Sequence, residues 1–263
     1  MTWLLTRAPA RTFRRNSLAL VIVQLRFHPI LKVAERIADF QDKVRPRFPG
    51  FDAVETQDIE ITPNGLGEVR KETAYRFHAV SEPTKVALGT SAVSIEYGAH
   101  QSREALLGDL ATVLSALDAV YTPIVPKRLG IRYVNLISKH RITSALGKPV
   151  NWRDLLTPNF AQVPGGVAEL DDVTTFLVEI TSPCARGRMT VRYGVVPVPG
   201  TAAATNPAER KFRLDTDRYI DGGLFKFDEV RTLASDFVED IFQVFMTAAG
   251  PALLEWMDQG ALS

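Results

Sequence analysis

Four polar residues in one strand-like segment, 128–135, have the types and spacing needed to bind an anion. The segment reads Arg-Leu-Gly-Ile-Arg-Tyr-Val-Asn, and its composition is typical of a β-strand. Arg128 and Arg132 then share one face of the strand, about 13 Å apart. Tyr133 and Asn135 share the other face. Planar guanidinium groups bind phosphate or carboxylate in a bidentate manner, so the segment predicts an anion contact, with pairing to acids on a neighbouring strand as the alternative.

A second basic segment, 186–193, repeats this combination of arginines with a tyrosine. Interleaved arginines and aromatic rings are typical of nucleic-acid faces, where phosphate contacts supply affinity and rings stack on bases. Lys and Arg number 31 against 30 acidic residues, however, so the net charge of +1 does not favour strong binding. A binder of nucleic acid or of a small anionic ligand remains one interpretation. Its predicted contacts are Arg128, Arg132, Tyr133, Asn135, Arg188 and Arg192.

Other chemical motifs are weak. Cys184 is the single cysteine, which excludes an internal disulfide and a cysteine-based zinc knuckle, and fits a reducing compartment. The four histidines form no i, i+4 pair, and no phosphate-binding loop, dinucleotide fingerprint or nucleophile elbow occurs. Asp215 and Asp217 share a strand face without further oxygen ligands for a hard cation, so solvent-facing polarity is expected there. The sequence predicts no metal, cofactor or catalytic residue, although distant residues can still assemble a site.

The composition is that of an ordinary folded protein. The chain has 263 residues, of which 46% are hydrophobic and 23% charged. Its first residues lack the pattern of a secretion signal, and the apolar stretch 18–27 is about half as long as a membrane-spanning helix. We therefore expect a cytoplasmic protein that does not bind a membrane.

The first part of the chain combines a strand, a helix, a meander and a second helix. Val23, Leu25 and Phe27 alternate with polar residues, which is typical of a half-buried strand. Ser102 has the type and position of a helix N-cap, and apolar residues recur after it at i, i+3, i+4 spacing. The expected elements are a strand at 18–27, a helix at 31–45, strands at 53–62, 73–81, 84–89 and 92–98, and a helix after 102.

The same order of strand, helix, meander and helix then begins again in the second part of the chain. The closing helix has its apolar residues on one stripe and places Asp228 and Glu229 at its N-terminal end, where the helix dipole favours negative charge. Pro251 marks a break in this helix. The expected elements are a strand at 127–137, a short helix at 152–156, strands at 175–181, 188–197 and 210–219, and the long closing helix.

Because this order of elements occurs twice, the sequence predicts an α+β fold with two similar strand–helix–meander–helix halves. Each half is expected to be a curved antiparallel sheet with long helices on one face, because one face of each sheet must be covered. TATA-binding-protein-like and helix-grip folds share this outline. The expected domains are a basic N-terminal arm at 1–16, a first half at 17–125, and a second half at 126–263 with an exposed loop at 196–208. The arm is expected to be a solvated tail.

Several of these segments together resemble a known family. The strand ends at 25–27 and 75–77, the segment 128–135 and the long closing helix are similar to an uncharacterised, sporadically distributed family of bacterial proteins of about this length. Members of that family carry acidic residues in the first strand, where this chain has Leu20 and Gln24. The resemblance implies an accessory gene in a mobile or defence-related context, and it supplies no established catalytic residues.

The sequence thus favours a non-enzymatic adaptor that binds a protein partner through a sheet face or the proline-rich loop. The binder of nucleic acid or a small anion described above is the alternative. Their dependence on salt separates the two, because phosphate contacts weaken steeply as salt rises and an apolar interface does not. An enzyme whose site is assembled from distant residues is a third possibility.

Overall fold

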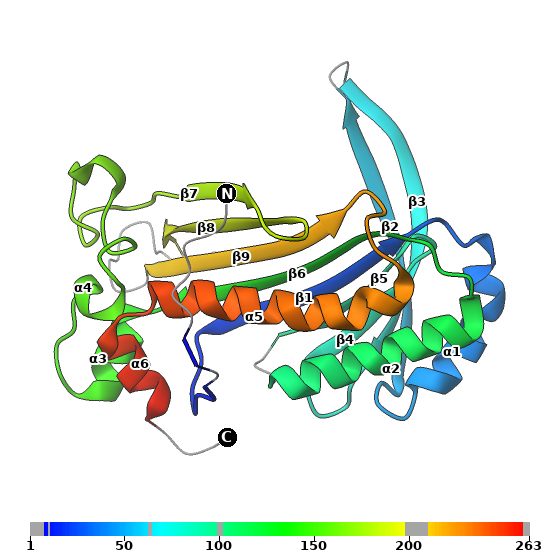
Figure 1. Ribbon diagram of the computed structural model, residues 1–263, viewed down its shortest axis with the longest axis horizontal. Coiled ribbons are helices and arrows are strands. Elements are labelled where there is room, and N and C mark those ends of the chain that lie inside the picture. Colours follow the sequence, from blue (N-terminus) through cyan, green and yellow to red (C-terminus); the bar gives the residue numbers. More distant parts are fainter. Residues whose placement is uncertain (1–7, 10, 63–64, 99–101, 198–209, 260–263) are drawn as a thin grey trace. The chain divides into compact units, whose positions relative to one another are not determined.

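The computed structural model describes residues 8–9, 11–62, 65–98, 102–197 and 210–259, and Figure 1 shows their helices and strands. The strands are β1 Leu18–Phe27, β2 Gly50–Thr62, β3 Gly65–His78, β4 Thr84–Leu88, β5 Ala92–Tyr97, β6 Pro126–Ile137, β7 Val178–Pro183, β8 Arg188–Val196 and β9 Lys211–Asp221. The helices are α1 Ile37–Val44, α2 Arg103–Tyr121, α3 Lys139–Leu146, α4 Trp152–Leu155, α5 Val230–Ala248 and α6 Pro251–Asp258.

The described strands form one open antiparallel sheet in the order β2-β3-β4-β5-β1-β6-β9-β8-β7. The predicted α+β class is therefore confirmed. Most strands that follow one another in the chain also lie side by side in the sheet, as expected for short antiparallel connections. The internal duplication and the TATA-binding-protein-like or helix-grip outline stay predictions.

The chain divides into two compact units. Unit 1 comprises Met1–Leu20, Arg132–Arg218 and Phe237–Ser263, and unit 2 comprises Val21–Ile131 and Tyr219–Asp236. The long strands β1, β6 and β9 contribute residues to both units. The predicted division into two halves, 17–125 and 126–263, stays a prediction.

In unit 2, helices pack on the apolar face of the strands. The hydroxyl of Ser102 accepts a hydrogen bond from the backbone N–H of Ala105 at 3.1 Å, which confirms the predicted N-cap of α2. The ring of Phe40 on α1 lies 5.4 Å from that of Phe77 on β3, and both side chains are fully buried. Burying an aromatic or aliphatic side chain of this kind stabilises a fold by about 1.5–3 kcal/mol.

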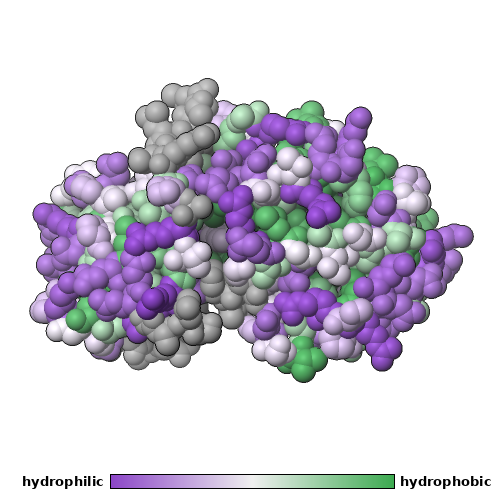
Figure 2. All heavy atoms as spheres, turned by 60° about the horizontal axis from the view of Figure 1, so that its bottom comes forward, coloured by the Kyte–Doolittle hydropathy of each residue, from purple (hydrophilic) through white to green (hydrophobic). Residues whose placement is uncertain are grey.

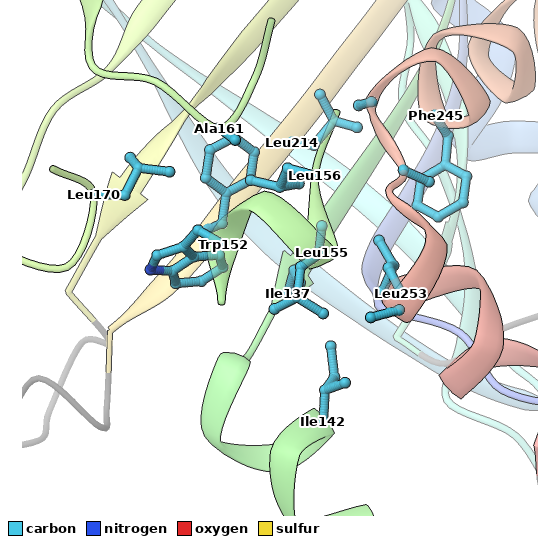
Figure 3. Packing of buried hydrophobic residues seen from close by; sticks show 14 of the residues in the cluster. Ile137, Ile142, Trp152, Leu155, Leu156, Ala161, Leu170, Leu214, Phe245 and Leu253 are labelled. Carbon is cyan, nitrogen blue, oxygen red and sulfur yellow. The ribbon is translucent and has the colours of Figure 1, made fainter. Parts of the chain in front are cut away.

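Unit 1 has its own hydrophobic core, which Figure 3 shows from close by. Trp152 on α4 packs against Phe212 on β9, with ring centroids 6.1 Å apart. Gly250, between α5 and α6, lies against α4 so closely that a Cβ atom there would be 2.6 Å from the carbonyl oxygen of Asp154. Its backbone N–H donates to the carbonyl of Leu155 at 2.8 Å. The break predicted at Pro251 is thus confirmed. It is the junction between α5 and α6, and α4 packs against it.

Three local predictions differ from the structure. Residues 139–146 form α3, which the sequence analysis does not predict, because the basic residues at its start extend the basic stretch of β6. The predicted helix at 31–45 is divided into a 3-10 segment, η1 Leu31–Arg36, and α1. β3 begins at Gly65 rather than at residue 73, since backbone pairing with β2 continues through residues that show no apolar alternation. The predicted loop at 196–208 lies almost entirely outside the described residues.

The described part of the N-terminal arm is docked, so the expected solvated tail is wrong for it. The backbone N–H groups of Arg14 and Arg15 donate to the carbonyl oxygen of Met257 at 3.0 and 2.9 Å. Arg11 forms an ion pair with Asp258. These cationic residues lie at the C-terminal end of α6, where the helix dipole favours positive charge.

Candidate functional site

Arg132 on β6 binds Asp215 on the neighbouring strand β9. Its Nε donates to Oδ1 at 2.8 Å and its Nη2 donates to Oδ2 at 2.7 Å, which is a bidentate arrangement. Arg213, also on β9, donates to the same carboxylate. The Asp215 side chain is 0% exposed. Arg132 is therefore held by an acid on a neighbouring strand, as the alternative interpretation of this segment expects.

Burial and the arginines act on Asp215 in opposite directions. Burial alone would raise the pKa of this carboxyl, but hydrogen bonding and charge from Arg132 and Arg213 outweigh it and lower the pKa. The hydrogen bond to Asp215 in turn raises the pKa of Arg132. The negative charge of Asp217 raises this pKa further. The expected solvent-facing position of Asp215 is wrong. Two guanidinium groups face two carboxylates, so the group is electrically neutral.

Arg192 on β8 pairs with Glu179, the residue opposite it on β7. Its Nε donates to a carboxylate oxygen of Glu179. The Glu179 side chain is 53% exposed, and an ion pair so exposed contributes about 0–1 kcal/mol to stability. Arg192 therefore also has a partner inside the protein.

Arg128 and Asn135, at the two ends of the predicted segment, make different contacts. The guanidinium carbon of Arg128 lies 4.7 Å from the ring centroid of Tyr219, within the range of a cation–π interaction. Asn135 is buried, and its Oδ1 accepts a hydrogen bond from the hydroxyl of Ser17 at 2.9 Å. Both side chains therefore have structural roles.

The two remaining predicted contacts are more open. Tyr133 is half-buried, and Arg188 is exposed at the start of β8. The carbonyl oxygen of Arg188 accepts a hydrogen bond from Arg218 at 3.3 Å. Arg128 belongs to unit 2, whereas the other five predicted contacts belong to unit 1. Within unit 1, Arg132 and Arg192 bind different carboxylates rather than converging on one position.

The partners of these arginines were not predicted. Asp215 and Glu179 lie on strands that the sequence does predict, at 210–219 and 175–181. A search for acids on the strand adjacent to each arginine would have found Glu179, because β7 and β8 follow one another in a hairpin. It would not have found Asp215, because nothing local shows that β9 neighbours β6.

A different surface lies at the end of the sheet. In the described part of the chain β7 pairs only with β8, because it ends the strand order. All of its residues are exposed or half-buried. Native edge strands of this kind expose hydrogen-bonding groups that can pair with another chain.

The direction of the backbone groups on β7 follows from two flanking hydrogen bonds. Phe176 donates to the carbonyl of Val195 at 3.1 Å, and Cys184 donates to that of Gly187 at 3.0 Å. Both pairs are in register with the β7–β8 ladder. Because hydrogen-bonded positions alternate along an antiparallel strand, the even-numbered residues of β7 bond to β8. The odd-numbered residues direct their N–H and C=O groups away from the sheet.

The outward-directed positions form a short ladder. Leu177, directly before β7, and Glu179 and Thr181 within it each present an N–H and a C=O group there, and Pro183, which has no N–H, ends the series. Thr181 is further positioned by its hydroxyl, which lies 2.8 Å from that of Thr190 on β8. The backbone of this edge is thus ordered in the conformation that a further strand would need.

Apolar side chains accompany these groups. Ile180 lies opposite Val191, which belongs to the core of unit 1, yet Ile180 is 43% exposed. Leu177 is 52% exposed. Hydrophobic residues also reach the surface elsewhere, and on the face drawn in Figure 2 they are interspersed with hydrophilic ones. At β7, however, apolar side chains coincide with outward-directed backbone groups.

Cys184 does not have the surroundings of a reactive thiol. It is half-buried, and burial raises the pKa of its thiol. A higher pKa leaves less of the nucleophilic thiolate at neutral pH. Within the described ranges, no group of three or more His, Cys, Asp or Glu side chains is placed to hold a metal ion.

The fold and these surfaces define an α+β protein with an open antiparallel sheet that ends, among the described residues, at the edge strand β7. In comparisons with known proteins, no family model and no curated protein matches the chain. Among the helices of the described residues, none combines the length and the apolar character needed to cross a bilayer.

Proposed function

We propose that the protein is a non-enzymatic adaptor, and that it binds a protein partner by adding one of the partner's strands to the outer edge of β7. The observation that carries this proposal is the outward direction of the backbone N–H and C=O groups of Leu177, Glu179 and Thr181. An extended segment pairs with such groups through main-chain hydrogen bonds, and side-chain contacts add specificity.

The energetics fit a partner of moderate affinity. Each backbone hydrogen bond contributes about 0.5–1.5 kcal/mol net, so a ladder over three residues supplies only part of the binding free energy. The exposed area of Ile180 and Leu177 supplies more when an apolar side chain covers it. We therefore expect the partner segment to carry β-branched or aromatic residues at alternate positions.

The edge also has features that oppose pairing with a second copy of itself. Pro183 shortens the ladder, and the charged side chain of Glu179 lies at its centre. Charges and proline on edge strands are the usual means by which natural sheets avoid self-association. This favours a different protein as the partner.

The context of the gene is inferred from the family resemblance alone, which points to an accessory protein in a mobile or defence-related setting and to a partner encoded nearby. The alternative function, binding of nucleic acid or a small anion on the sheet, has less support. Arg132 and Arg192 would have to exchange carboxylate partners within the chain for phosphate groups.

The partner is first identified by native mass spectrometry of the protein purified at low salt from its own host. Hydrogen exchange of the free protein and of the complex then locates the interface. We expect the partner to protect the amides of Leu177, Glu179 and Thr181, which point outward. The amide of Ile180 is bonded to β8 already and should change little. Equal protection of odd and even positions, or none, would contradict strand addition.

A pair of variants tests the same groups. Thr181→Pro removes the side-chain hydroxyl and one outward N–H. Thr181→Val removes the hydroxyl as well but keeps that N–H. We expect Thr181→Pro to weaken partner binding by about tenfold or more, because a proline at this position also obstructs the approaching strand. Thr181→Val should bind like the unmodified protein. If both variants bind equally well, β7 is not the interface.

A further inference from the structure

A cavity of about 250 Å³ lies in unit 1. The side chains that matter for its chemistry come from α3, α4, β8 and two intervening segments. They are Lys139, Trp152, Leu170, Asp171, Val195 and Arg210. None of the six contacts predicted from the sequence lines this cavity.

Trp152 provides an indole N–H donor at the wall of the cavity. The residue is only 5% exposed. Its indole nitrogen lies on the side of the ring that faces away from Ile137 and Leu155 (Figure 3). The residue lines the cavity. Because a tryptophan N–H is a donor that usually finds a hydrogen-bond partner, it is suited to bind an acceptor in the cavity.

Lys139 places a positive charge beside the same ring. Its ammonium nitrogen lies 5.8 Å from the ring centroid of Trp152 and forms an ion pair with Asp171. The ammonium group has three donor hydrogens, and the single carboxylate of Asp171 uses only part of this hydrogen-bonding capacity. Lys139 therefore keeps donor capacity at the wall of the cavity.

Arg210 places a second positive charge there. Its Nη1 donates to the carbonyl oxygen of Val173 at 2.9 Å and to that of Asp171 at 3.3 Å. Its Nε is buried and has no hydrogen-bond partner among the described residues. A buried donor left in this state costs about 1–3 kcal/mol.

The cavity thus has an excess of one positive charge, because Lys139 and Arg210 face a single carboxylate, that of Asp171. The remaining wall is apolar at Leu170 and Val195 and polar at His140 and Thr143. Its volume is slightly below the range of about 300–1,000 Å³ found for sites that hold drug-sized ligands, so a compact ligand fits.

We propose that this cavity binds a small carboxylic acid with an apolar body. Its carboxylate would accept hydrogen bonds from the indole N–H of Trp152 and from Lys139, and its apolar part would lie against Leu170 and Val195. A hydrogen bond to a charged group is roughly twice as strong as one between neutral groups, so the negative charge contributes much of the recognition. The site is independent of the adaptor function proposed above.

Benzoate is a suitable probe, with its neutral isostere benzamide as the comparison. The indole N–H signal of Trp152, assigned with the variant Trp152→Phe, is followed by ¹H–¹⁵N NMR of the full chain during titration. We expect benzoate to shift this signal saturably with a Kd of about 0.1–10 mM, as usual for about nine non-hydrogen atoms. Benzamide should bind at least about tenfold more weakly.

Two lysine variants separate the site from general charge effects. Lys139→Met removes the ammonium group beside Trp152. Lys148→Met removes a lysine of the same unit that also forms an ion pair, with Glu255, but does not line the cavity. We expect Lys139→Met to weaken benzoate binding at least about fivefold and Lys148→Met to leave it unchanged.

Three results would overturn the proposal. They are the absence of a saturable shift at about 20 mM benzoate, an equal affinity for benzamide, and an equal effect of the two lysine variants. Loss of partner binding in Thr181→Pro has no bearing on them. A fourth result would also overturn it: if inorganic phosphate displaced benzoate at equal concentration, the site would recognise charge alone, and the carboxylic acid assignment would be wrong.

Discussion

The carboxylate of Asp215 is fully buried between two strands and receives both hydrogen bonds of a bidentate contact from Arg132. Removing one partner of a buried ion pair leaves an uncompensated charge, which usually costs about 3–5 kcal/mol. Arg213 remains beside Asp215 in the absence of Arg132 and lowers this cost. We therefore expect Arg132→Met to reduce the free energy of unfolding by about 3 kcal/mol, measured by urea denaturation.

The matched control for this prediction is Arg192→Met. It removes the same side-chain type from a pair whose carboxylate is more than half exposed. The expected loss is less than about 1 kcal/mol. Similar losses in the two variants would show that burial of Asp215 has no energetic consequence.

Acid should destabilise the protein in part through Asp215. Because its pKa in the folded state lies below the unfolded value, the unfolded chain binds more protons as the pH falls past about 4. The stabilisation is complete above the unfolded pKa and is lost as the pH falls through the folded one. Unfolding free energies of the unmodified protein and of Asp215→Asn should therefore converge below about pH 4. Parallel curves would contradict the lowered pKa.

The junction between α5 and α6 depends on the absence of a side chain at Gly250. A Cβ atom there would meet backbone atoms of Asp154, Leu155 and Leu156 at 2.6–2.8 Å, and backbone cannot move aside as a flexible side chain can. We expect Gly250→Ala to destabilise the protein by about 2–4 kcal/mol in thermal or urea unfolding, through overpacking and displacement of α4.

Gly108 on α2 is the control for that substitution. It is exposed, and a Cβ atom there would have no neighbour within 4 Å. Alanine is favoured over glycine inside a helix, so Gly108→Ala should stabilise the protein by about 0.5–1 kcal/mol. The two substitutions should therefore have opposite signs, and a loss of stability in both would refute the steric account.

Local elements could be predicted because their signals are local. The cap at Ser102 and the apolar spacing after it predict α2, and the structure has both. The same reasoning applied to Ser138 would have found α3, because its hydroxyl accepts a hydrogen bond from the N–H of Arg141 at 3.3 Å. The run of basic residues that follows Ser138 instead resembles a continuation of the preceding strand.

Contacts between distant residues could not be predicted in this way. Arg132 and Asp215 are 83 positions apart, and only the order of strands in the sheet decides that they meet. The cavity beside Trp152 has the same origin, since its walls come from separate helices, strands and loops. A helix stripe indicates that a tryptophan is buried, but it does not show that its side chain lines a cavity.

The alternative function makes a quantitative claim about Arg192. Each phosphate contact makes the slope of log K against log salt more negative by about 0.9, so losing one contact reduces the magnitude of the slope by that amount. Because Arg192 binds Glu179, we expect Arg192→Ala to change the slope for a labelled duplex by much less. Fluorescence anisotropy over a salt series measures it, with Lys148→Ala as the control for another paired cation. A full loss of about 0.9 for Arg192→Ala alone would support nucleic-acid binding on this sheet instead.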